Sequence, residues 1–423
     1  MGRKADSIVK TGTFGSGDEV DVRRKLLLVA GARPNYMKIA PIYWALEEGA
    51  RETFDVEIVH TGQHYDPSLS DDFFRDLSLP PPSANLGVGS GTHGAQTARV
   101  LDGFEQLVSE KRPDVVVVVG DVNSTAACSL VTAKAHGTQC GDRPRPILAH
   151  VEAGLRSRDR MMPEEVNRIV TDALSDLLFT TSPDADENLR AEGHPDARIR
   201  RVGNTMIDSL LRSLPRAHEI GLPSSLAAAR DSGGYALATL HRPSNVDDAE
   251  RLAGILEALA HLARERPVFL PLHPRTRTRI DSFGFGRLLA PDATRATSGV
   301  VPLPPLSYLE MLLAQQSAVV VLTDSGGLQE ETTALGVPCV TIRENTERPI
   351  TILEGTNVLA GTTRAGILEG VEQALAKCAQ TTPCPELWDG RAGERIVAEL
   401  LREVGTNART RASIPSPVRE LVA

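Results

Sequence analysis

Short apolar runs recur through the first half of the chain, separated by stretches of mixed character. The runs are Lys25–Ala30, Val56–His60, Val115–Val119, Ile147–Val151 and Leu177–Thr181. Runs of this length that are apolar almost throughout are typical of strands buried on both faces of a parallel sheet. Apolar residues with helical spacing fill the intervals, around Ile39–Glu48, Gln96–Lys111, Thr125–His136 and Glu164–Ser175. This alternation predicts an α/β fold with a parallel sheet covered by helices on both faces.

The second half of the chain repeats the pattern. The predicted strands are Ala236–Thr239, Val268–Leu272, Val319–Thr323 and Cys339–Ile342, and the predicted helices lie near Asp248–Glu265, Ser307–Ala314, Leu328–Leu335 and Ala365–Cys378. Prolines and paired glycines predict a break near Asp208–Gly233. We therefore expect two similar lobes, residues 25–207 and 208–385, that face each other across a cleft. Ligands of open α/β sheets bind at the carboxyl ends of the strands, so both lobes would contribute to one site.

The two ends and the cysteines bear on where the protein works. Residues 1–24 and 405–423 are polar and are expected to be a flexible leader and a flexible tail. The leader lacks the apolar stretch of a signal peptide, and no apolar run approaches the ~20 residues needed to span a membrane. The five cysteines are scattered, odd in number and without zinc-ligand spacing. This pattern fits a reducing compartment better than a disulfide framework and predicts a cytoplasmic protein.

Net charge and missing motifs exclude several functions. The formal charge of −9 argues against a general nucleic-acid binder, although local cations can still hold an anionic small ligand. Neither half has a G-x-G-x-x-G turn after its first strand, and no P-loop lysine motif occurs. Hydride transfer with NAD and ATP-dependent chemistry are therefore disfavoured. No cluster of histidine, cysteine and acidic residues has metal spacing, so neither a metal nor a cofactor is expected.

Two strand ends in the first half combine glycine with charged side chains. Gly31–Lys38 leads from a strand into a helix and carries Arg33 and Lys38, which suit an anion at a helix N-terminus. The alternative is a tight turn with a surface arginine. Gly120–Thr125 follows the five-valine strand and places Asp121 toward a cleft. Its alternative is an ordinary helix cap, which aspartate, asparagine and serine all favour.

The next strand end has a stronger signal. Glu152 comes directly after an apolar strand, and Arg156 stands four residues on. The alternative is a buried Glu–Arg ion pair, but such pairs are weak stability devices, so a functional role is favoured. Glu164 lies at the start of a predicted helix, where a proline followed by acidic residues is an ordinary start signal. Arg168 continues that helix and is a candidate for the cleft.

Three segments of the second half suit a nucleotide. His241, followed by an arginine, ends a strand. Thr323–Glu331 combines a strand end, two glycines and a helix start, so its free N–H groups and helix dipole favour a phosphate, and its final acidic pair suits ribose hydroxyls. Arg343 and Arg348 follow another strand and suit a diphosphate. The alternatives are a structural histidine, a glycine-rich turn with a solvated acidic face, and a solvated charged loop.

In their joint order these segments resemble the non-hydrolysing UDP-N-acetylglucosamine 2-epimerases. The resemblance runs from about Lys25 to Gly361 and rests on GARPNYMK, TGQHYD, GDVNST, HVEAGLRS, MPEEVNR, VGNTMID, TLHRP, TDSGGLQEE and TERP. It implies a glycosyltransferase-B type of fold, with two Rossmann-like lobes and a final helix, residues 386–404, that crosses back to the first lobe. It also implies a UDP-sugar as substrate and a homodimer.

The resemblance further implies the chemistry. UDP-N-acetylglucosamine is converted to UDP-N-acetylmannosamine by elimination of UDP and its re-addition to 2-acetamidoglucal. Asp121, Glu152 and Glu164 match the family's catalytic carboxylates, and His241, which matches a UDP-site motif, is placed with them. The predicted substrate-binding residues, from the family's UDP-site motifs and the strand ends above, are Arg33, Lys38, Arg156, Arg168, Ser325, Gly326, Gly327, Glu331, Arg343 and Arg348.

Some features depart from the family pattern and leave alternatives open. Thr138–Arg145 looks like an insertion. Many bacterial members need a second UDP-N-acetylglucosamine, bound near a Gln-His-Arg pattern. Here Tyr65 removes that positive charge and Asp66 adds a negative one, so we expect no such requirement. A hydrolysing epimerase, a glycosyltransferase of the same fold and a non-catalytic UDP-sugar-binding protein remain as alternatives, although the three retained acids argue against the last.

Overall fold

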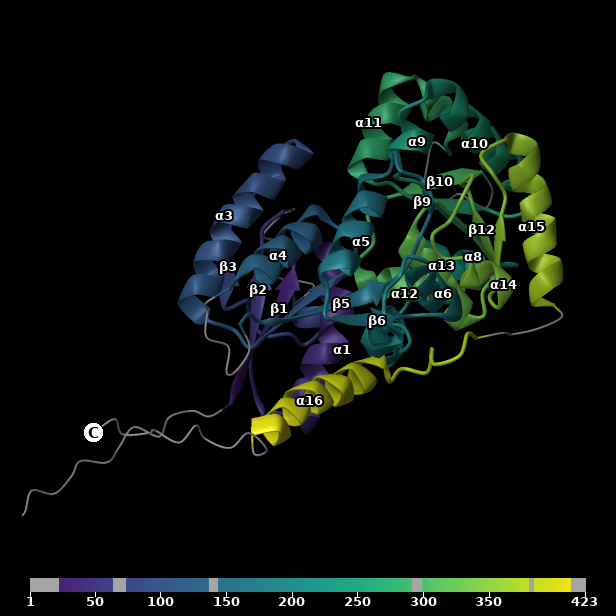
Figure 1. Ribbon diagram of the computed structural model, residues 1–423. Coiled ribbons are helices and arrows are strands. Elements are labelled where there is room, and N and C mark those ends of the chain that lie inside the picture. Colours follow the sequence, from purple (N-terminus) through teal and green to yellow (C-terminus); the bar gives the residue numbers. More distant parts are fainter. Residues whose placement is uncertain (1–22, 64–73, 137–143, 291–298, 380–383, 412–423) are drawn as a thin grey trace, which may run out of the picture.

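Two parallel sheets organise the chain in the computed structural model, which describes residues 23–63, 74–136, 144–290, 299–379 and 384–411 (Figure 1). The first has the order β3-β2-β1-β4-β5-β6-β7, and the second has the order β10-β9-β8-β11-β12-β13. The first sheet comprises β1 (Arg24–Ala30), β2 (Phe54–His60), β3 (Ala84–Asn85), β4 (Val115–Val119), β5 (Ile147–Ala153), β6 (Leu177–Thr180) and β7 (Ile199–Arg201). The second comprises β8 (Ala236–Thr239), β9 (Val268–Pro271), β10 (Val300–Leu303), β11 (Val320–Thr323), β12 (Cys339–Thr341) and β13 (Asn357–Leu359). This arrangement confirms the prediction of two Rossmann-like α/β lobes.

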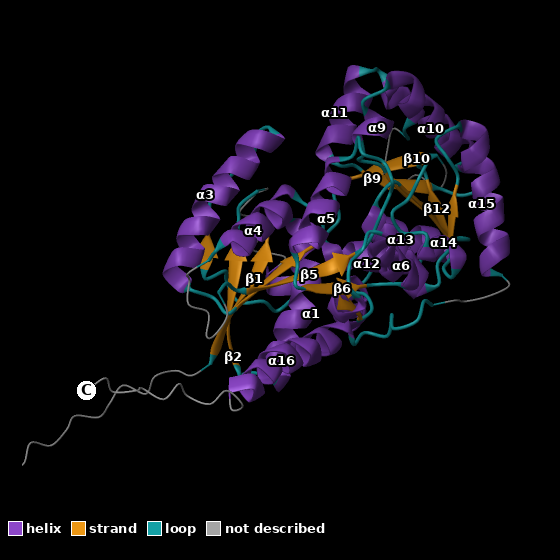
Figure 2. Ribbon diagram, viewed as in Figure 1, coloured by secondary structure: helices purple, strands orange, loops and turns teal. Residues whose placement is uncertain are grey.

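Helices cover both faces of each sheet, and Figure 2 shows the two groups of strands lying apart with helices around each. The helices up to residue 231 are α1 (Arg33–Gly49), α3 (His93–Lys111), α4 (Asn123–Lys134), α5 (Pro163–Leu174), α6 (Pro183–Ala191), α7 (Thr205–Ile220) and α8 (Ser224–Asp231). The later ones are α9 (Pro243–Val246), α10 (Ala249–Leu262), α11 (Pro274–Ser282), α12 (Tyr308–Gln316), α13 (Gly326–Leu335), α14 (Ile350–Leu353), α15 (Arg364–Cys378) and α16 (Ala392–Arg411). Among the described helices none is both long and apolar enough to cross a membrane.

The continuous apolar runs have a direct structural cause. Side chains alternate between the two faces of a strand, so a strand buried on both faces needs apolar residues at every position. Leu26 and Leu28 of β1 enter the core beneath α1, while Leu27 and Val29 enter the core beneath α3 and α4. All five valines of β4 are likewise buried, in alternation between the same two cores.

The predicted strands are confirmed to within two residues at each end, but other details differ. Strands β3, β7, β10 and β13, which have two to four residues, were not predicted. Helix α1 begins at Arg33, six residues before the predicted start, because Pro34 is compatible with a helix start. The chain passes from the first sheet to the second between β7 and β8, an interval that contains the predicted break near Asp208–Gly233. Within it α7 runs through Pro215 and α8 follows, so the predicted boundary at residues 207 and 208 falls inside a helix.

The last helix crosses back to the first lobe, as the resemblance implied (Figure 1). Ile396, Val397 and Leu400 of α16 are buried in the core that also contains the apolar face of α1. Just before the helix, the indole N–H of Trp388 donates a hydrogen bond of 3.0 Å to the Thr181 carbonyl of the first lobe. Residues 405–411 continue α16, so the predicted flexible tail is wrong for them. The leader residues 1–22 and the tail residues 412–423 lie outside the described part of the chain.

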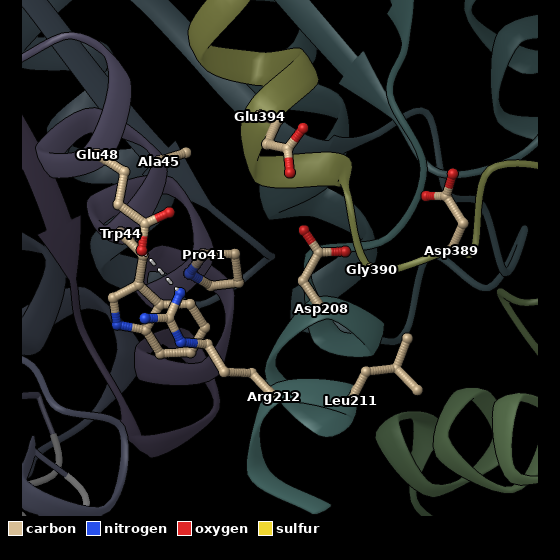
Figure 3. A pocket seen from close by; sticks show the side chains of 10 residues that line it. All are labelled: Pro41, Trp44, Ala45, Glu48, Asp208, Leu211, Arg212, Asp389, Gly390 and Glu394. Atoms are coloured by element: carbon tan, nitrogen blue, oxygen red, sulfur yellow. Dashed lines mark hydrogen bonds and ion pairs between the residues drawn. The ribbon is translucent and has the colours of Figure 1, made fainter.

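A buried aspartate ties α16 to α7 where the lobes join (Figure 3). The Asp208 carboxylate accepts a hydrogen bond of 2.8 Å from the Gly393 N–H, in the first turn of α16. A side chain at Gly393 would lie 2.4 Å from the Pro41 carbonyl oxygen, so glycine is what lets α16 approach α1 this closely. Beside this contact, Arg212 of α7 stacks 4.3 Å from the ring of Trp44 on α1. Burial raises the pKa of Asp208 to about 6, despite the N–H donors around it.

We predict that Asp208→Asn stabilises the protein at alkaline pH. The folded state keeps the Asp208 proton between about pH 4 and pH 6, whereas the unfolded state loses it, so the free energy of unfolding falls as pH rises through this window. Asparagine can still accept from Gly393 but carries no charge. The variant should gain up to about 3 kcal/mol over the parent at pH 8 and nothing at pH 4, measured as midpoints of thermal unfolding. Asp281→Asn, at an exposed position on α11, is the control that should change neither value. An equal effect at both pH values would show that the buried charge is not the cause.

Candidate active site

The predicted site residues gather at the carboxyl ends of the strands, on the facing edges of the two sheets. In each sheet the strand order reverses direction at a switch point, between β1 and β4 in the first and between β8 and β11 in the second. Ligands of this fold class bind in the crevice outside such points. Asp121 follows β4, and His241 and Ser325 follow β8 and β11. The topology therefore brings together residues that lie far apart in the sequence.

Glu152 lies at the centre of this edge in an unusual backbone conformation. Its φ of +73° is in the left-handed region, and it is the extra residue of a bulge between Val151 and Ala153 in the pairing of β5 with β6. A non-glycine residue held there costs on the order of 1–3 kcal/mol and persists only where its surroundings impose it. The conformation directs the buried carboxylate to Lys38 of α1 and to Arg348 of the other lobe.

Arg348 joins the two lobes electrostatically. Its Nη2 donates a hydrogen bond of 2.7 Å to Glu152, its Nε forms an ion pair of 3.0 Å with Glu330, and its Nη1 binds Glu347. Burial would raise the pKa of Glu152, but the positive charges of Lys38 and Arg348 hold it below the usual value. The contact between Glu152 and Arg348 thus keeps a carboxylate ionised in the interior, where it would be costly without a counter-ion.

The other two carboxylates around Arg348 respond differently to burial. Burial raises the pKa of Glu330 to about 7, although Arg348 opposes the shift. Glu330 also accepts a hydrogen bond of 3.0 Å from the side-chain amide of Asn204, at the start of α7. Burial would raise the pKa of Glu347 as well, but the charges of Arg348 and Arg343 hold it far below its usual range. One carboxylate is thus firmly ionised while its neighbour titrates near neutral pH.

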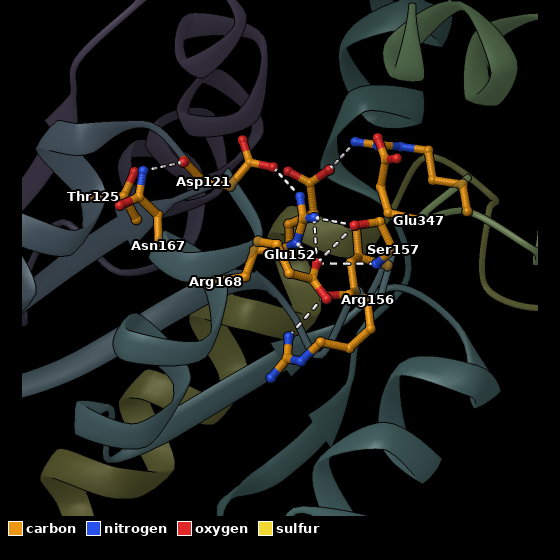
Figure 4. A network of polar contacts seen from close by, with 12 residues as sticks. Asp121, Thr125, Glu152, Arg156, Ser157, Asn167, Arg168 and Glu347 are labelled. Atoms are coloured by element: carbon orange, nitrogen blue, oxygen red, sulfur yellow. Dashed lines mark hydrogen bonds and ion pairs between the residues drawn. The ribbon is translucent and has the colours of Figure 1, made fainter. Parts of the chain in front are cut away.

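Asp121 is held by helix α5, as Figure 4 shows. Its carboxylate forms an ion pair with Arg168, whose Nη2 also donates a hydrogen bond of 2.5 Å to Glu165. The side-chain amide of Asn167 donates a hydrogen bond of 2.9 Å to the backbone carbonyl of Asp121. The side chain and the backbone of Asp121 are therefore both fixed from one helix. About a quarter of the Asp121 side chain, 27%, stays exposed, so a ligand can still reach it.

Glu164 faces the other lobe from the first turn of α5. Its side chain is half-buried. Burial and the charge of Arg343 lower the pKa of Arg242, and the negative charges of Glu347 and Glu164 oppose that shift. The negative charge of Glu164 therefore acts on Arg242, which follows β8. Glu164 therefore lies at the start of a helix, as the alternative reading of the sequence supposed, and it also faces the second lobe.

His241 is oriented by a buried aspartate to which the sequence pattern assigned no role of its own. Asp324 pairs with the Nδ1 of His241 at 3.0 Å and accepts the backbone N–H of Arg242 at 2.9 Å. Burial would raise the pKa of Asp324, but hydrogen bonding to His241 and the histidine's charge lower it. The imidazole is 42% exposed, so its other nitrogen is available to a ligand. A carboxylate between a strand and a glycine turn was the signal that could have identified Asp324.

The start of α13 is shaped for an anion. Ser325 is the cap residue, and Gly326 and Gly327 form the first turn, whose N–H groups have no partner within the helix. A side chain at Gly326 would lie 2.5 Å from the Nη1 of Arg348, so only glycine lets the guanidinium lie against this turn. A helix N-terminus next to a guanidinium favours a phosphate through both its dipole and its donors.

Two predicted substrate-binding residues are engaged elsewhere. The guanidinium of Arg156 does not pair with Glu152, as the ion-pair alternative supposed, but binds Asp172 and Glu192, each at 2.7 Å. Glu331 accepts a hydrogen bond of 2.7 Å from Gln315 of α12, and burial raises its pKa to about 7. The geometry does not favour a direct substrate contact for either residue. The cause for Glu331 is helical periodicity: Glu330 faces the cleft, so its neighbour faces the lobe interior.

Other predicted positions have a simpler outcome. Lys38, Arg168 and Arg343 lie in the polar network, where they pair with Glu152, Asp121 and Glu347 respectively. Their roles in substrate binding remain predictions. The side chain of Arg33, the pair Tyr65–Asp66 and most of the predicted insertion Thr138–Arg145 lie outside the described residues.

Comparisons with known proteins agree on one family. The family model described as UDP-N-acetylglucosamine 2-epimerase matches residues 47–401. The UDP-N-acetylglucosamine 2-epimerase of Methanocaldococcus jannaschii is 39% identical over 379 residues, which cover 89% of this chain and 98% of that protein. The UDP-2,3-diacetamido-2,3-dideoxy-D-glucuronate 2-epimerase of Pseudomonas aeruginosa is 40% identical over 384 residues, which cover 90% of this chain and 100% of that protein.

Solved structures give the same result. The crystal structure of the M. jannaschii epimerase in complex with UDP-GlcNAc and UDP superposes with a TM-score of 0.77, at 39% identity, and covers 89% of this chain and 99% of that one. An α,α-trehalose 6-phosphate synthase from Burkholderia multivorans matches with a TM-score of 0.51 at 12% identity over 94% of this chain and all of that one. The second likeness concerns the fold alone.

We predict that Arg348→Met destabilises the protein more at high pH than at low pH. The substitution leaves three buried carboxylates with one arginine fewer, and removal of one partner from a buried ion pair typically costs about 3–5 kcal/mol. Acid restores part of the loss, because the orphaned carboxylates can take protons as pH falls from about 8 to about 6. Thermal unfolding at both pH values measures this. Arg402→Met, at an exposed pair with Glu399 on α16, should have little effect at either pH. A pH-independent loss in Arg348→Met would instead indicate lost packing.

Proposed function

Because the chain belongs to the UDP-N-acetylglucosamine 2-epimerase family, we propose that it interconverts UDP-N-acetylglucosamine and UDP-N-acetylmannosamine without releasing the free sugar. The observation that carries this proposal is the contact between Glu152 of the first lobe and Arg348 of the second. A carboxylate suited to proton transfer thereby lies beside a cation suited to a diphosphate. The reaction needs both groups at adjacent carbons of one sugar.

The chemistry begins with an elimination. A carboxylate removes the proton from carbon 2, the electron pair forms the double bond between carbons 1 and 2, and the bond from carbon 1 to the UDP oxygen breaks. The products are UDP and 2-acetamidoglucal, both held by the protein. Re-addition reverses these steps with the proton delivered to the opposite face of carbon 2. Asp121, Glu152 and Glu164 are the carboxylates proposed for these proton transfers, and two of them must act from opposite faces of the ring.

Substrate binding itself is proposed to activate Glu152. In the ligand-free arrangement Lys38 and Arg348 hold this carboxylate ionised and weakly basic. A diphosphate at the start of α13 attracts the same two cations. Glu152 then loses part of its positive surroundings, its pKa rises, and it becomes a stronger base where the carbon 2 proton is presented.

The departing UDP needs donors and a dry environment. The N–H groups of Gly326 and Gly327, with Arg348, would stabilise negative charge on the leaving phosphate. His241, oriented by Asp324, can give a hydrogen bond from its exposed edge to a phosphate oxygen. Closure of the lobes around the sugar excludes water, which would otherwise trap the intermediate and release the free sugar.

Two further features belong to the proposal. We expect a homodimer that acts in the cytoplasm, as the family resemblance and the scattered cysteines suggested.

A modified hexosamine is the second candidate substrate class, because the Pseudomonas relative is named as a 2-epimerase of a diacetamido glucuronate. A hydrolysing outcome differs only in the fate of the intermediate.

We predict that the pure protein converts UDP-N-acetylglucosamine reversibly to UDP-N-acetylmannosamine, without added metal or nicotinamide, and that deuterium enters carbon 2 in heavy water. Proton NMR of the reaction measures both the product and the exchange. Free N-acetylmannosamine with stoichiometric UDP would support the hydrolysing alternative. No change with this substrate, but turnover of a UDP-diacetamido uronate, would move the proposal to the second substrate class.

We also predict that Asp121→Asn, Glu152→Gln and Glu164→Gln each lower kcat by ~10²–10⁴-fold in folded protein, because each removes a placed proton-transfer group. Glu187→Gln, at an exposed position on α6, is the control. The fall in activity on the acidic side, caused by protonation of Glu152, should lie at higher pH in the kcat profile than in the kcat/KM profile. The kcat profile reports the pKa of Glu152 in the substrate complex, and the kcat/KM profile reports it in the free enzyme. Near-parental turnover in Glu164→Gln would leave that residue with its helix-start role alone.

A further inference from the structure

Helix α5 buries a polar face and exposes apolar residues, the reverse of an ordinary surface helix. Its buried residues are polar, namely Glu165, Arg168, Thr171 and Asp172, whereas Val166 and Val170 are exposed. Surface helices normally bury an apolar stripe and expose a polar one. Glu165 and Arg168 serve the Asp121 side of the candidate site, as described above. Asp172, one turn further along the same face, has no role in the reaction as proposed and none in the sequence prediction.

Asp172 binds the chain on both sides of Glu152. Its Oδ1 lies 2.6 Å from the Nδ1 of His150, two residues before Glu152. Its Oδ2 accepts a hydrogen bond of 3.1 Å from the Gly154 N–H, two residues after Glu152, and one of 2.7 Å from Arg156. Asp172 and His150 are completely buried. One carboxylate therefore clamps the two ends of the bulge whose extra residue is Glu152.

The same carboxylate reaches the strand end that carries Asp121. The Nε2 of His150 lies 2.9 Å from the carbonyl oxygen of Gly120, the residue directly before Asp121. A carbonyl oxygen can only accept, so this nitrogen carries a proton. The Nδ1 of His150 faces the Asp172 carboxylate, which already accepts from Arg156 and Gly154. Both ring nitrogens of His150 thus face hydrogen-bond acceptors, and the ring is completely shielded from solvent.

We propose that Asp172 and His150 are positioning residues for the epimerisation, which set the backbone of Glu152 and of Asp121 in one relative arrangement. The inference rests on the proposed function. Neither side chain reaches the cleft, so neither touches the substrate. They act through hydrogen bonds to Gly154, two residues after Glu152, and to Gly120, directly before Asp121.

Electrostatics supports the same assignment. Glu152 faces Lys38 from α1, Arg348 and Glu330 from the second lobe, and His150 from its own strand, and the charges of Lys38, Arg348 and His150 all act to lower its pKa. Burial would raise the pKa of Asp172, but the charges of His150 and Arg156 hold it below the usual value. Once the diphosphate has drawn away Lys38 and Arg348, His150 is the positive charge that remains near Glu152.

The test is Asp172→Asn, with Asp176→Asn as a matched control. Asp176 also holds β5, through the Leu148 N–H at 2.9 Å and Arg145 at 2.8 Å, but at the opposite end of the strand. Asp172→Asn preserves size and some hydrogen bonding but removes the counter-ion of His150, whose charge lowers the pKa of Glu152. We expect kcat and the rate of carbon 2 deuterium exchange to fall by ~10–10³-fold, with UDP affinity by calorimetry changed less than about twofold. The acidic limb of the kcat profile should move to higher pH, because Glu152 loses a neighbouring positive charge. Asp176→Asn should lower thermal stability and leave kcat and its pH profile unchanged.

His150→Gln provides an independent variant, which carries the same test if Asp172→Asn does not fold. It should reproduce the loss of kcat and the shifted limb, and the double variant should be no slower than the slower single variant. An unchanged pH profile in both variants, or a loss of kcat that only follows thermal stability as in Asp176→Asn, would overturn the inference. A parent protein that epimerises normally in that experiment keeps the proposed function intact. A parent protein without epimerisation overturns the proposed function and this inference with it.

Discussion

The structure depends on how charge is neutralised where the two lobes meet. Arg348 of the second lobe is buried among Glu152, Glu330 and Glu347, and Lys38 of the first lobe shares the Glu152 carboxylate. Charged groups are expensive to bury unless they are paired, so these contacts are obligatory while the lobes are together. They are also the contacts that a diphosphate is expected to exchange for its own. The cations that join the lobes and the cations that would hold the substrate are the same groups.

The scaffold around this charge cluster has conventional parts and one unconventional helix. The parallel sheets and their apolar strands account for stability, and they deliver strand ends to the cleft by topology alone. Helix α5 instead turns Glu165, Arg168 and Asp172 inward, so its packing against the sheet is made of hydrogen bonds and ion pairs. The buried charges on this face are costly unless they are paired, and that requirement leaves few arrangements of Asp121 and Glu152 open. The left-handed backbone at Glu152 is the clearest sign of this constraint.

The comparisons distinguish a likeness in fold alone from membership of an enzyme family. A trehalose 6-phosphate synthase shares the two-lobed architecture at 12% identity, so the architecture alone does not define a reaction. The epimerase family shares sequence along most of the chain, and its members are named for more than one UDP-sugar. The names of these relatives share epimerisation at carbon 2 and differ in the sugar, so family membership indicates the position of the reaction but not the substituents of the sugar.

The sequence by itself determined the class of fold, most strands and the segments that carry chemistry. Strands buried on both faces must be apolar at every position, and a glycine turn that opens a helix is a short, continuous pattern, so both features can be recognised locally. It did not reveal the continuity of α7 through Pro215, because the packing of that helix against α1 and α12 overrides a local breaking signal. It also assigned Arg156 and Glu331 to the substrate, although both pair inside a lobe.

Which carboxylate faces which cation is decided by the register of a helix against a sheet and by the closeness of two lobes. Glu152 and Arg348 lie in different lobes, and their contact exists only when both sheets are in place. Asp172 and His150 are 22 residues apart in the chain and meet only because α5 packs on β5. That proximity is a property of the tertiary structure, since a local pattern specifies which face of a helix is polar but not which groups it will meet.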